Sequence, residues 1–210
     1  MQRVAVGLAA MLGIAVSCAA HAQASGGGDP QRGTSIAAAR GCTSCHGADG
    51  NGPVPAFPKL AGLQASYITK QLSDFKQGKR ASVAMVQAVA ELSAQDMSDL
   101  AAFFARSRMI PGPAGDPSLA MVGKLIYEDG NPATGVPSCT GCHSTDGMGS
   151  ERYPRLASQS AEYLAGELKT FASGKRRNDR GLMQSVAERM TEREMKAVSE
   201  FVAAMPGPSQ

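Results

Sequence analysis

Apolar residues recur with helical spacing in two matching stretches of the chain, and each stretch ends at a glycine. The first contains Tyr67, Ile68, Leu72 and Phe75 before Gly78, and the second contains Tyr163, Leu164, Leu168 and Phe171 before Gly174. Residues spaced in this way share one face of a helix, and glycine commonly ends one. The pattern predicts two amphipathic helices at corresponding places in the chain.

Capping residues mark the starts of four further helices. They are Asp29 and Asp116, each followed by proline, and the capping-box pairs Ser93–Asp96 and Thr191–Glu194. An acidic cap before proline is typical of a first helical turn, and the box satisfies the free N–H groups of another. With no convincing strand pattern between these signals, the sequence predicts an all-α fold.

The two halves of the chain repeat each other. Residues 57–80 and 153–176 share ten identities in 24 positions, and the flanking segments also match. A two-fold repeat of this length indicates domain duplication rather than a solenoid of short units. We therefore expect an N-terminal domain at 28–106, a Pro- and Gly-containing linker at 107–115, and a C-terminal domain at 116–205.

The first 24 residues have the features of an export signal. Arg3 precedes the apolar stretch Val4–Val16, which is too short to span a bilayer, and small residues follow. The prediction is a cleaved signal peptide at 1–24 and a periplasmic protein. The alternative is a lipid anchor at Cys18, although Ala15 stands where such signals usually have leucine.

Charge and composition narrow the class of protein. The formal net charge of +3 falls to +2 once Arg3 leaves with the signal, which is too little to indicate nucleic-acid binding. The chain has no Trp, six Phe and four Tyr, few large side chains for two domain cores. A large flat cofactor in each domain would supply the missing apolar volume.

The same short motif occurs once in each half. "GCTSCHGADG" fills positions 41–50 and "SCTGCHSTDG" fills 138–147. C-x-x-C-H is the signature of c-type haem attachment, because the two thiols can reach the two vinyl groups and the histidine then faces the iron. Zinc would need a second ligand pair in each domain, and a thioredoxin-like site would need a βαβ unit. Two covalent haems, on Cys42 with Cys45 and on Cys139 with Cys142, are therefore expected.

The histidine count limits the axial ligands. Only three histidines occur: His21 in the signal, and the motif residues His46 and His143. A second histidine on either iron would have to come from a partner, so the sixth ligand is Met, Lys, another weak donor or nothing.

Two pairs of methionines recur at matching repeat positions. Met97 and Met195 each come four residues after a capping residue, where they can pack against Leu92 and Met190 just before the cap. This position favours a core-filling role for both. Met85 and Met183 lie between the amphipathic helix and the capping box, with enough chain after each histidine to return on the far side of a haem. We predict Met85 and Met183 as iron ligands; Met148 is expected near a haem edge.

Other residues have candidate supporting roles. The carbonyls of Pro58 and Pro154 can accept the second N–H of His46 and His143, or these prolines simply form turns. The loop glycines (Gly47, Gly50, Gly52, Gly147 and Gly149) allow close passage of the haem or only shape a loop. Six basic residues provide docking charges, propionate contacts or solvated loop charges: Lys79, Arg80, Lys175, Arg176, Arg177 and Arg180.

Together, the two CxxCH motifs, "FPKLAG", "YPRLAS", Met85 and Met183 resemble the periplasmic dihaem cytochromes c4 over almost the whole mature length. The resemblance implies two class I cytochrome c domains about a pseudo-two-fold axis, His/Met iron in each, and Pro58 and Pro154 as acceptors from the histidines. Leu63 departs from the family pattern, which has Gln there; Gln159 keeps it in the second copy. If this glutamine joins the domains, the contacts differ in this chain.

Closed His/Met sites suit electron transfer rather than catalysis. The expected function is a periplasmic one-electron carrier, with a quinol–cytochrome c reductase and a terminal oxidase as partners implied by the family. Binding is expected to redox proteins and not to nucleic acid, with peripheral association to a membrane. The alternatives are the cytochrome subunit of a dehydrogenase, such as a flavocytochrome c sulfide dehydrogenase, and a dihaem peroxidase, which would need an open iron.

Overall fold

The computed structural model describes residues 27–112 and 115–207, which form ten helices. The first half contains α1 (Pro30–Ala39), α2 (Cys42–His46), α3 (Ala65–Lys76), α4 (Val83–Val89) and α5 (Ala94–Arg106). The second half contains α6 (Pro117–Asp129), α7 (Thr140–His143), α8 (Ala161–Ala172), α9 (Leu182–Ala187) and α10 (Glu192–Ala204). Within these residues the only β pairing is an isolated bridge between Asn131 and Val136, so the all-α prediction is confirmed.

The predicted caps form as expected. The Asp29 carboxylate accepts from the N–H groups of Gln31 and Arg32, and Asp116 does the same at the start of α6. Both capping boxes are complete, with the side chains of Asp96 and Glu194 accepting from the N-cap backbone. Local sequence therefore fixes the ends of the helices that carry most of the packing.

In each half, the first and last helices cross at a glycine. A Cβ on Gly33 of α1 would lie 2.1 Å from the Asp99 carbonyl oxygen of α5, and one on Gly123 of α6 would lie 1.9 Å from that of Ala197 on α10. Only glycine allows this separation. The crossing brings the start of each half onto its end and closes one domain.

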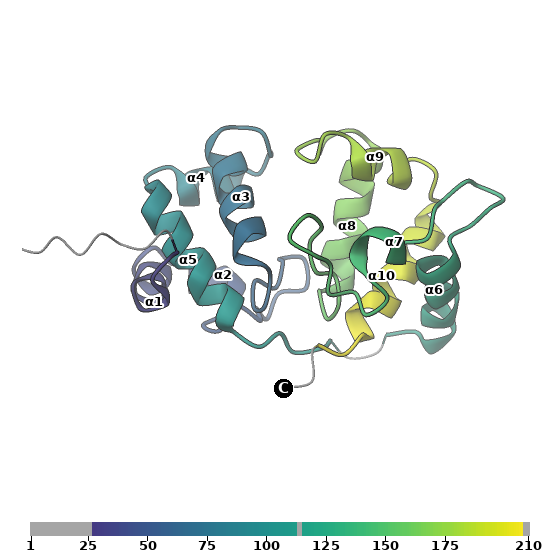
Figure 1. The fold of residues 1–210 in the computed structure, drawn as a ribbon, viewed down its shortest axis with the longest axis horizontal. Coiled ribbons are helices and arrows are strands. Elements are labelled where there is room, and N and C mark those ends of the chain that lie inside the picture. Colours follow the sequence, from purple (N-terminus) through teal and green to yellow (C-terminus); the bar gives the residue numbers. More distant parts are fainter. Residues whose placement is uncertain (1–26, 113–114, 208–210) are drawn as a thin grey trace, which may run out of the picture.

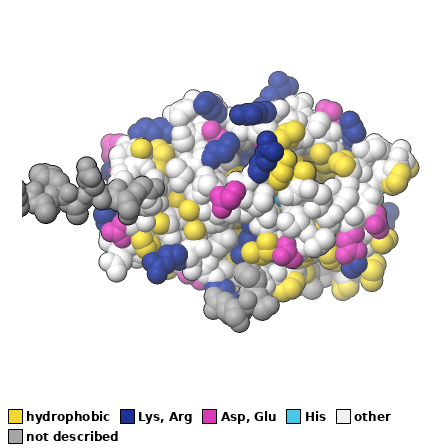
Figure 2. Space-filling model, in the orientation of Figure 1, with side chains coloured by type: hydrophobic (Ala, Val, Ile, Leu, Met, Phe, Trp, Pro, Cys, Tyr) yellow, Lys and Arg dark blue, Asp and Glu magenta, His cyan; other side chains and the backbone are white. Residues whose placement is uncertain are grey.

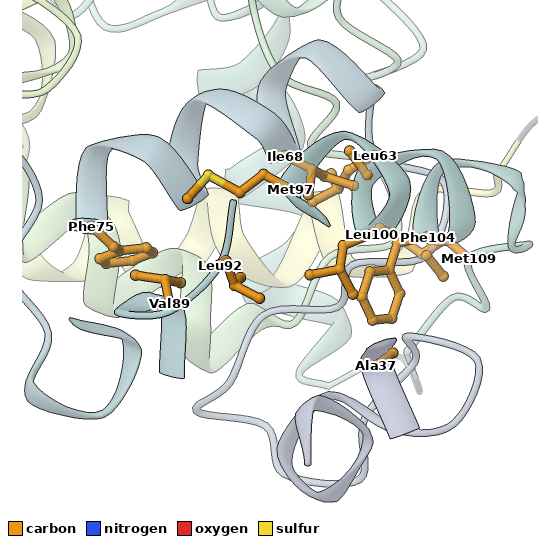
Figure 3. Packing of buried hydrophobic residues seen from close by; sticks show 12 residues of the cluster. Ala37, Leu63, Ile68, Phe75, Val89, Leu92, Met97, Leu100, Phe104 and Met109 are labelled. Carbon is orange, nitrogen blue, oxygen red and sulfur yellow. The ribbon is translucent and has the colours of Figure 1, made fainter. Parts of the chain in front are cut away.

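The core of the first domain lies beneath this crossing. Figure 3 shows Leu100, Phe104 and Met109 together above Ala37, with Phe75, Val89 and Leu92 at the other end. The second domain has an equivalent core that includes Phe171, Met195 and Val202. Met97 and Met195 are both buried, which confirms that they fill the cores.

The two domains lie side by side about a pseudo-two-fold axis (Figure 1). Gln159 of the second domain bonds the backbone of Lys59 in the first. The reciprocal contact is made by Gln64, whose Oε1 accepts from Arg155 N–H at 3.0 Å and whose Nε2 donates to the Tyr153 carbonyl at 3.3 Å. Leu63, where the family pattern has glutamine, is buried in the first core, and the next residue takes the bridging role.

None of the described helices has the length and apolar character needed to cross a membrane. The predicted signal peptide and the alternative lipid site at Cys18 lie outside the described residues. Where it is described, the predicted linker forms no helix or strand, and Gly112 N–H donates to the Ala203 carbonyl at the end of α10.

Candidate functional site

Each cysteine motif forms one short helix. In α2, Cys42 is half-buried, Cys45 is exposed and His46 is buried; in the second domain Cys139 is the N-cap residue of α7. None of the four motif cysteines is paired in a disulfide. Burial raises the pKa of Cys139 to about 11, and Cys142 nearby adds to the effect. Two thiols and an imidazole thus lie within a single turn at the surface of each domain.

The motif histidines are held by proline carbonyls. His46 Nδ1 lies 3.0 Å from the Pro58 oxygen, and His143 Nδ1 lies 2.9 Å from that of Pro154. Burial lowers the pKa of both histidines, and these bonds oppose the shift only partly. Each ring is therefore neutral at pH 7, with its proton on Nδ1. The lone pair of Nε2 is left free to bind a metal.

Glycine-rich loops bring the prolines to the histidines. Gly52 N–H donates to the His46 carbonyl at 2.7 Å, and Leu60 N–H donates to the Gly50 carbonyl at 2.7 Å. Gly50 has φ +83°, and a Cβ there would lie 2.7 Å from Ala61 N. These close approaches are between backbone segments, which favours the loop-shaping interpretation of the glycines.

One residue beside the second motif was not anticipated. The Tyr127 side chain is fully buried, its hydroxyl donates to the Ser144 carbonyl at 2.7 Å, and its ring packs on Phe201. Burial raises the pKa of this hydroxyl. The corresponding core position in the first domain is Ala37, so the backbone after His143 has a support that the first domain lacks.

Met85 and Met183 occupy matching places in the two domains. They lie in the short helices α4 and α9, which the sequence patterns did not predict, and each is half-buried against its domain core. Ser82 Oγ accepts from Met85 N–H at 3.3 Å, and Asp179 accepts from Met183 N–H at 2.6 Å. A capped turn therefore fixes the backbone of each methionine. Met148 is also half-buried against the second core.

The six basic residues separate into two groups. Arg80 and Arg176 are buried at the domain interface, where each bonds residues of the other domain. Lys79, Lys175, Arg177 and Arg180 are exposed. Figure 2 shows Lys and Arg side chains along the top of the molecule, where Figure 1 places the loops after α3 and α8. We call residues 77–82 and 174–181 the basic loops.

The donor set in each domain fits covalent haem. Two free thiols one turn apart, a neutral histidine with its Nε2 unused and a half-buried methionine are present in both copies. Across the described ranges no three His, Cys, Asp or Glu side chains are arranged to hold a metal ion by themselves. When bound, haem supplies a one-electron ferric/ferrous couple. The chain supplies the anchor, the ligand orientation and the enclosing core.

Comparisons with known proteins agree with this donor set. The cytochrome c family model matches residues 30–107 and 120–206. Cytochrome c4 of Pseudomonas aeruginosa is 42% identical over 182 residues, which is 85% of this chain and 89% of that protein. The crystal structure of reduced recombinant cytochrome c4 from Pseudomonas stutzeri has a TM-score of 0.81 and 36% identity, and covers 85% of this chain and 100% of that one.

A third relative is described by its electron donor. The thiosulfate dehydrogenase electron acceptor of Thiomonas intermedia is 36% identical over 173 residues, which is 80% of each chain. The two matched domains define the protein as a c-type cytochrome with two haem-binding units. More narrowly, the chain belongs to the dihaem cytochrome c4 family. It carries two covalently bound haem c groups and is an electron-transfer protein rather than an enzyme.

Proposed function

We propose that each domain holds one six-coordinate His/Met iron. Thioethers form at Cys42 and Cys45 in the first domain, with His46 and Met85 on the iron. In the second domain the thioethers form at Cys139 and Cys142, and His143 and Met183 bind the iron. The bonds from the histidines to Pro58 and Pro154 support this assignment, because they orient each ring and leave Nε2 as the metal-binding atom.

The proposed role is a one-electron carrier in the periplasm. With both axial positions filled, neither iron has an open site for substrate, and His/Met ligation raises the potential relative to histidine-only ligation. The N-terminal export pattern supports the location. We assign a quinol–cytochrome c reductase as donor and a terminal oxidase as acceptor, reached by peripheral association with the membrane.

The basic loops are the proposed docking surface. Lys79, Lys175, Arg177 and Arg180 are exposed there, beside Val83 and Leu182, which are 81% and 56% exposed. These apolar residues come just before Met85 and Met183 in the chain. Positive charges around an apolar centre suit the acidic face of a redox partner, because opposite charges speed the encounter and the apolar contact is desolvated.

A second candidate function is that of an electron acceptor for a dehydrogenase. The relative from Thiomonas intermedia supports it, since its name states that role for thiosulfate dehydrogenase. A sulfide-oxidising flavocytochrome is the other member of this class that the sequence suggests. In that role the chain would receive electrons from an enzyme subunit rather than from a quinol-oxidising complex.

Stopped-flow reduction of the oxidised protein distinguishes these functions. The protein is mixed with a quinol–cytochrome c reductase and quinol, or with thiosulfate dehydrogenase and thiosulfate, and its reduction is followed by haem absorbance. The carrier proposal expects fast reduction by the reductase, strongly slowed by salt, followed by reoxidation by the oxidase. Fast reduction by the dehydrogenase alone would replace the proposal with the second candidate.

A further inference from the structure

Two arginines bridge the domain interface in a reciprocal arrangement. Arg80 Nη2 donates to Tyr163 OH at 2.9 Å and to Glu167 Oε1 at 2.8 Å, both in the second domain. Arg176 Nη2 donates to Tyr67 OH at 3.1 Å and to Gln71 Oε1 at 3.3 Å, both in the first. The arginines, the tyrosines and the underlying Phe75 and Phe171 all correspond in the sequence repeat.

The two halves differ at the position whose side chain accepts hydrogen bonds from the two arginines. Gln71 of α3 corresponds to Glu167 of α8, so one position is neutral and the other carries a carboxylate. Glu167 accepts from both Arg80 and Arg176, and the Gln71 oxygen also receives a bond from each. The nearby Lys70 and Asp74 pair with each other and add no net charge. The pair 71/167 therefore carries the main charge difference between the two sides of the interface.

Glu167 is ionised at neutral pH. Burial alone would raise the pKa of its carboxyl, but the charges of Arg176 and Arg80 outweigh burial and lower it. Both arginine side chains are only 9% exposed and that of Glu167 is 21% exposed, so solvent screens this charge less than a surface charge. A fixed negative charge thus lies between the domains, on one side of an otherwise repeated arrangement.

We propose that the Gln71/Glu167 difference sets the two haem potentials apart and makes Glu167 a tuning residue for electron flow between the domains. The inference rests on the dihaem carrier function. One-electron reduction of each iron, ferric to ferrous, adds one negative charge to its site. A nearby carboxylate opposes that addition and lowers the midpoint potential. At an effective dielectric of about 20, one charge changes a reduction equilibrium by about threefold or more at separations up to about 25 Å.

The test compares matched variants by spectro-electrochemical titration. Glu167→Gln removes the carboxylate, Gln71→Glu adds a second one, and the double variant moves it across the interface with no change in total charge. Glu162→Gln is the control, because Glu162 is an exposed carboxylate on the same helix α8. Haem content and the low-spin electron paramagnetic resonance signal of each variant are measured first. Two low-spin haems show that the carrier function itself is intact.

The two single variants are expected to shift the mean midpoint potential in opposite directions. E167Q raises the mean midpoint potential, equivalent to about threefold or more in the reduction equilibrium, and Q71E lowers it. The double variant keeps the mean near that of the original protein but changes the separation between the two potentials. E162Q has a smaller effect because water and salt screen an exposed charge.

Two outcomes would overturn the inference. One is an E167Q shift no larger than that of E162Q, and the other is a double variant with an unchanged separation, in each case with two low-spin haems present. If E167Q fails to fold, Q71E and the double variant still decide, since both keep a carboxylate between the arginines. Loss of a low-spin haem in the unaltered protein would instead contradict the proposed ligation.

Discussion

The side-chain amide of Gln159 in the second domain hydrogen-bonds both the backbone N–H and the backbone carbonyl of Lys59 in the first. Its Oε1 accepts from Lys59 N–H at 2.8 Å, and its Nε2 donates to the Lys59 carbonyl at 2.8 Å. Lys59 directly follows Pro58, whose carbonyl holds His46. The bridge between the domains is therefore continuous with the backbone that orients a proposed iron ligand.

The first prediction concerns this bridge. Gln159→Leu copies the residue found at the equivalent position, Leu63, and leaves the Lys59 backbone groups unpaired at the interface. We expect the free energy of unfolding to fall by about 1–3 kcal/mol, the usual cost of such groups. Urea unfolding followed by circular dichroism measures it. Gln77→Leu, at an exposed position after α3, is the control, and equal effects of the two substitutions would contradict the bridging role.

The second prediction concerns a fully buried carboxylate in the first domain. Asp99 Oδ1 accepts from Asp29 N–H at 2.7 Å, and Arg32 Nε lies 3.0 Å from Oδ2, so this side chain ties α1 to α5. Asp99→Ala should lower the free energy of unfolding by about 1.5–3 kcal/mol, since it removes the charge-assisted bonds from Asp29 N–H and Arg32 to a fully buried carboxylate. Ala197 holds the matching place in the second domain, which shows that alanine fits this helix crossing.

Denaturant unfolding of Asp99→Ala measures this loss. Ser98→Ala is the control, because the hydroxyl of this half-buried neighbour bonds the Ala94 carbonyl within α5. If the free energies of unfolding of the two variants agree within about 0.5 kcal/mol, the buried carboxylate does not stabilise the domain.

The third prediction is a pH dependence from Glu167. Its pKa is lowered in the folded protein, so its stabilising effect is fully present above the unfolded value of about 4.3 and is lost as the pH falls through the folded value. The stability difference between the protein and Glu167→Gln should therefore be constant near neutrality and shrink below about pH 4. Urea unfolding at a series of pH values measures it. If the difference in the free energy of unfolding between the two proteins grows as the pH falls, the prediction is wrong.

The fourth prediction concerns the basic loops. Reversing two charges there, Lys175→Glu with Arg177→Glu, should slow electron transfer to an acidic redox partner by about tenfold at low salt and much less at high salt. Stopped-flow rates against ionic strength measure this. The matched control is Lys124→Glu with Lys196→Glu, which makes the same charge change on α6 and α10. If the control slows the reaction equally, net charge and not this surface is responsible.

Much of the fold could be predicted because its signals are local. The caps at Asp29 and Asp116, the capping boxes and the glycine after α3 each act within one turn of helix, so spacing alone identified them. The repeat then predicted two domains of one kind. The CxxCH motifs are local too, since both thiols and the imidazole lie in a single turn.

The remaining features depend on contacts between distant segments. From the sequence, Arg80 and Arg176 could only be grouped with four other basic residues, whereas in the structure both are buried between the domains. Gln64 had no local signal either, because its partners lie more than 80 residues away. Tyr127 had no such signal, because it corresponds to Ala37 only through the helix crossings at Gly33 and Gly123, and not when the caps of α1 and α6 are aligned. The helices α4 and α9 are too short for a periodic pattern to show.

The assignment of Met85 and Met183 is the central claim. Met85→Leu and Met183→Leu keep nearly the same volume and remove only the sulfur, and Met97→Leu, in the first core, is the control. The direct measurement is electron paramagnetic resonance of the ferric proteins, with haem content determined in parallel. We expect two low-spin haems in the unaltered protein and in M97L. In M85L and in M183L we expect one low-spin haem and one that is high-spin or newly ligated. Two unchanged low-spin signals in M85L or M183L, or loss of one in M97L, would contradict it.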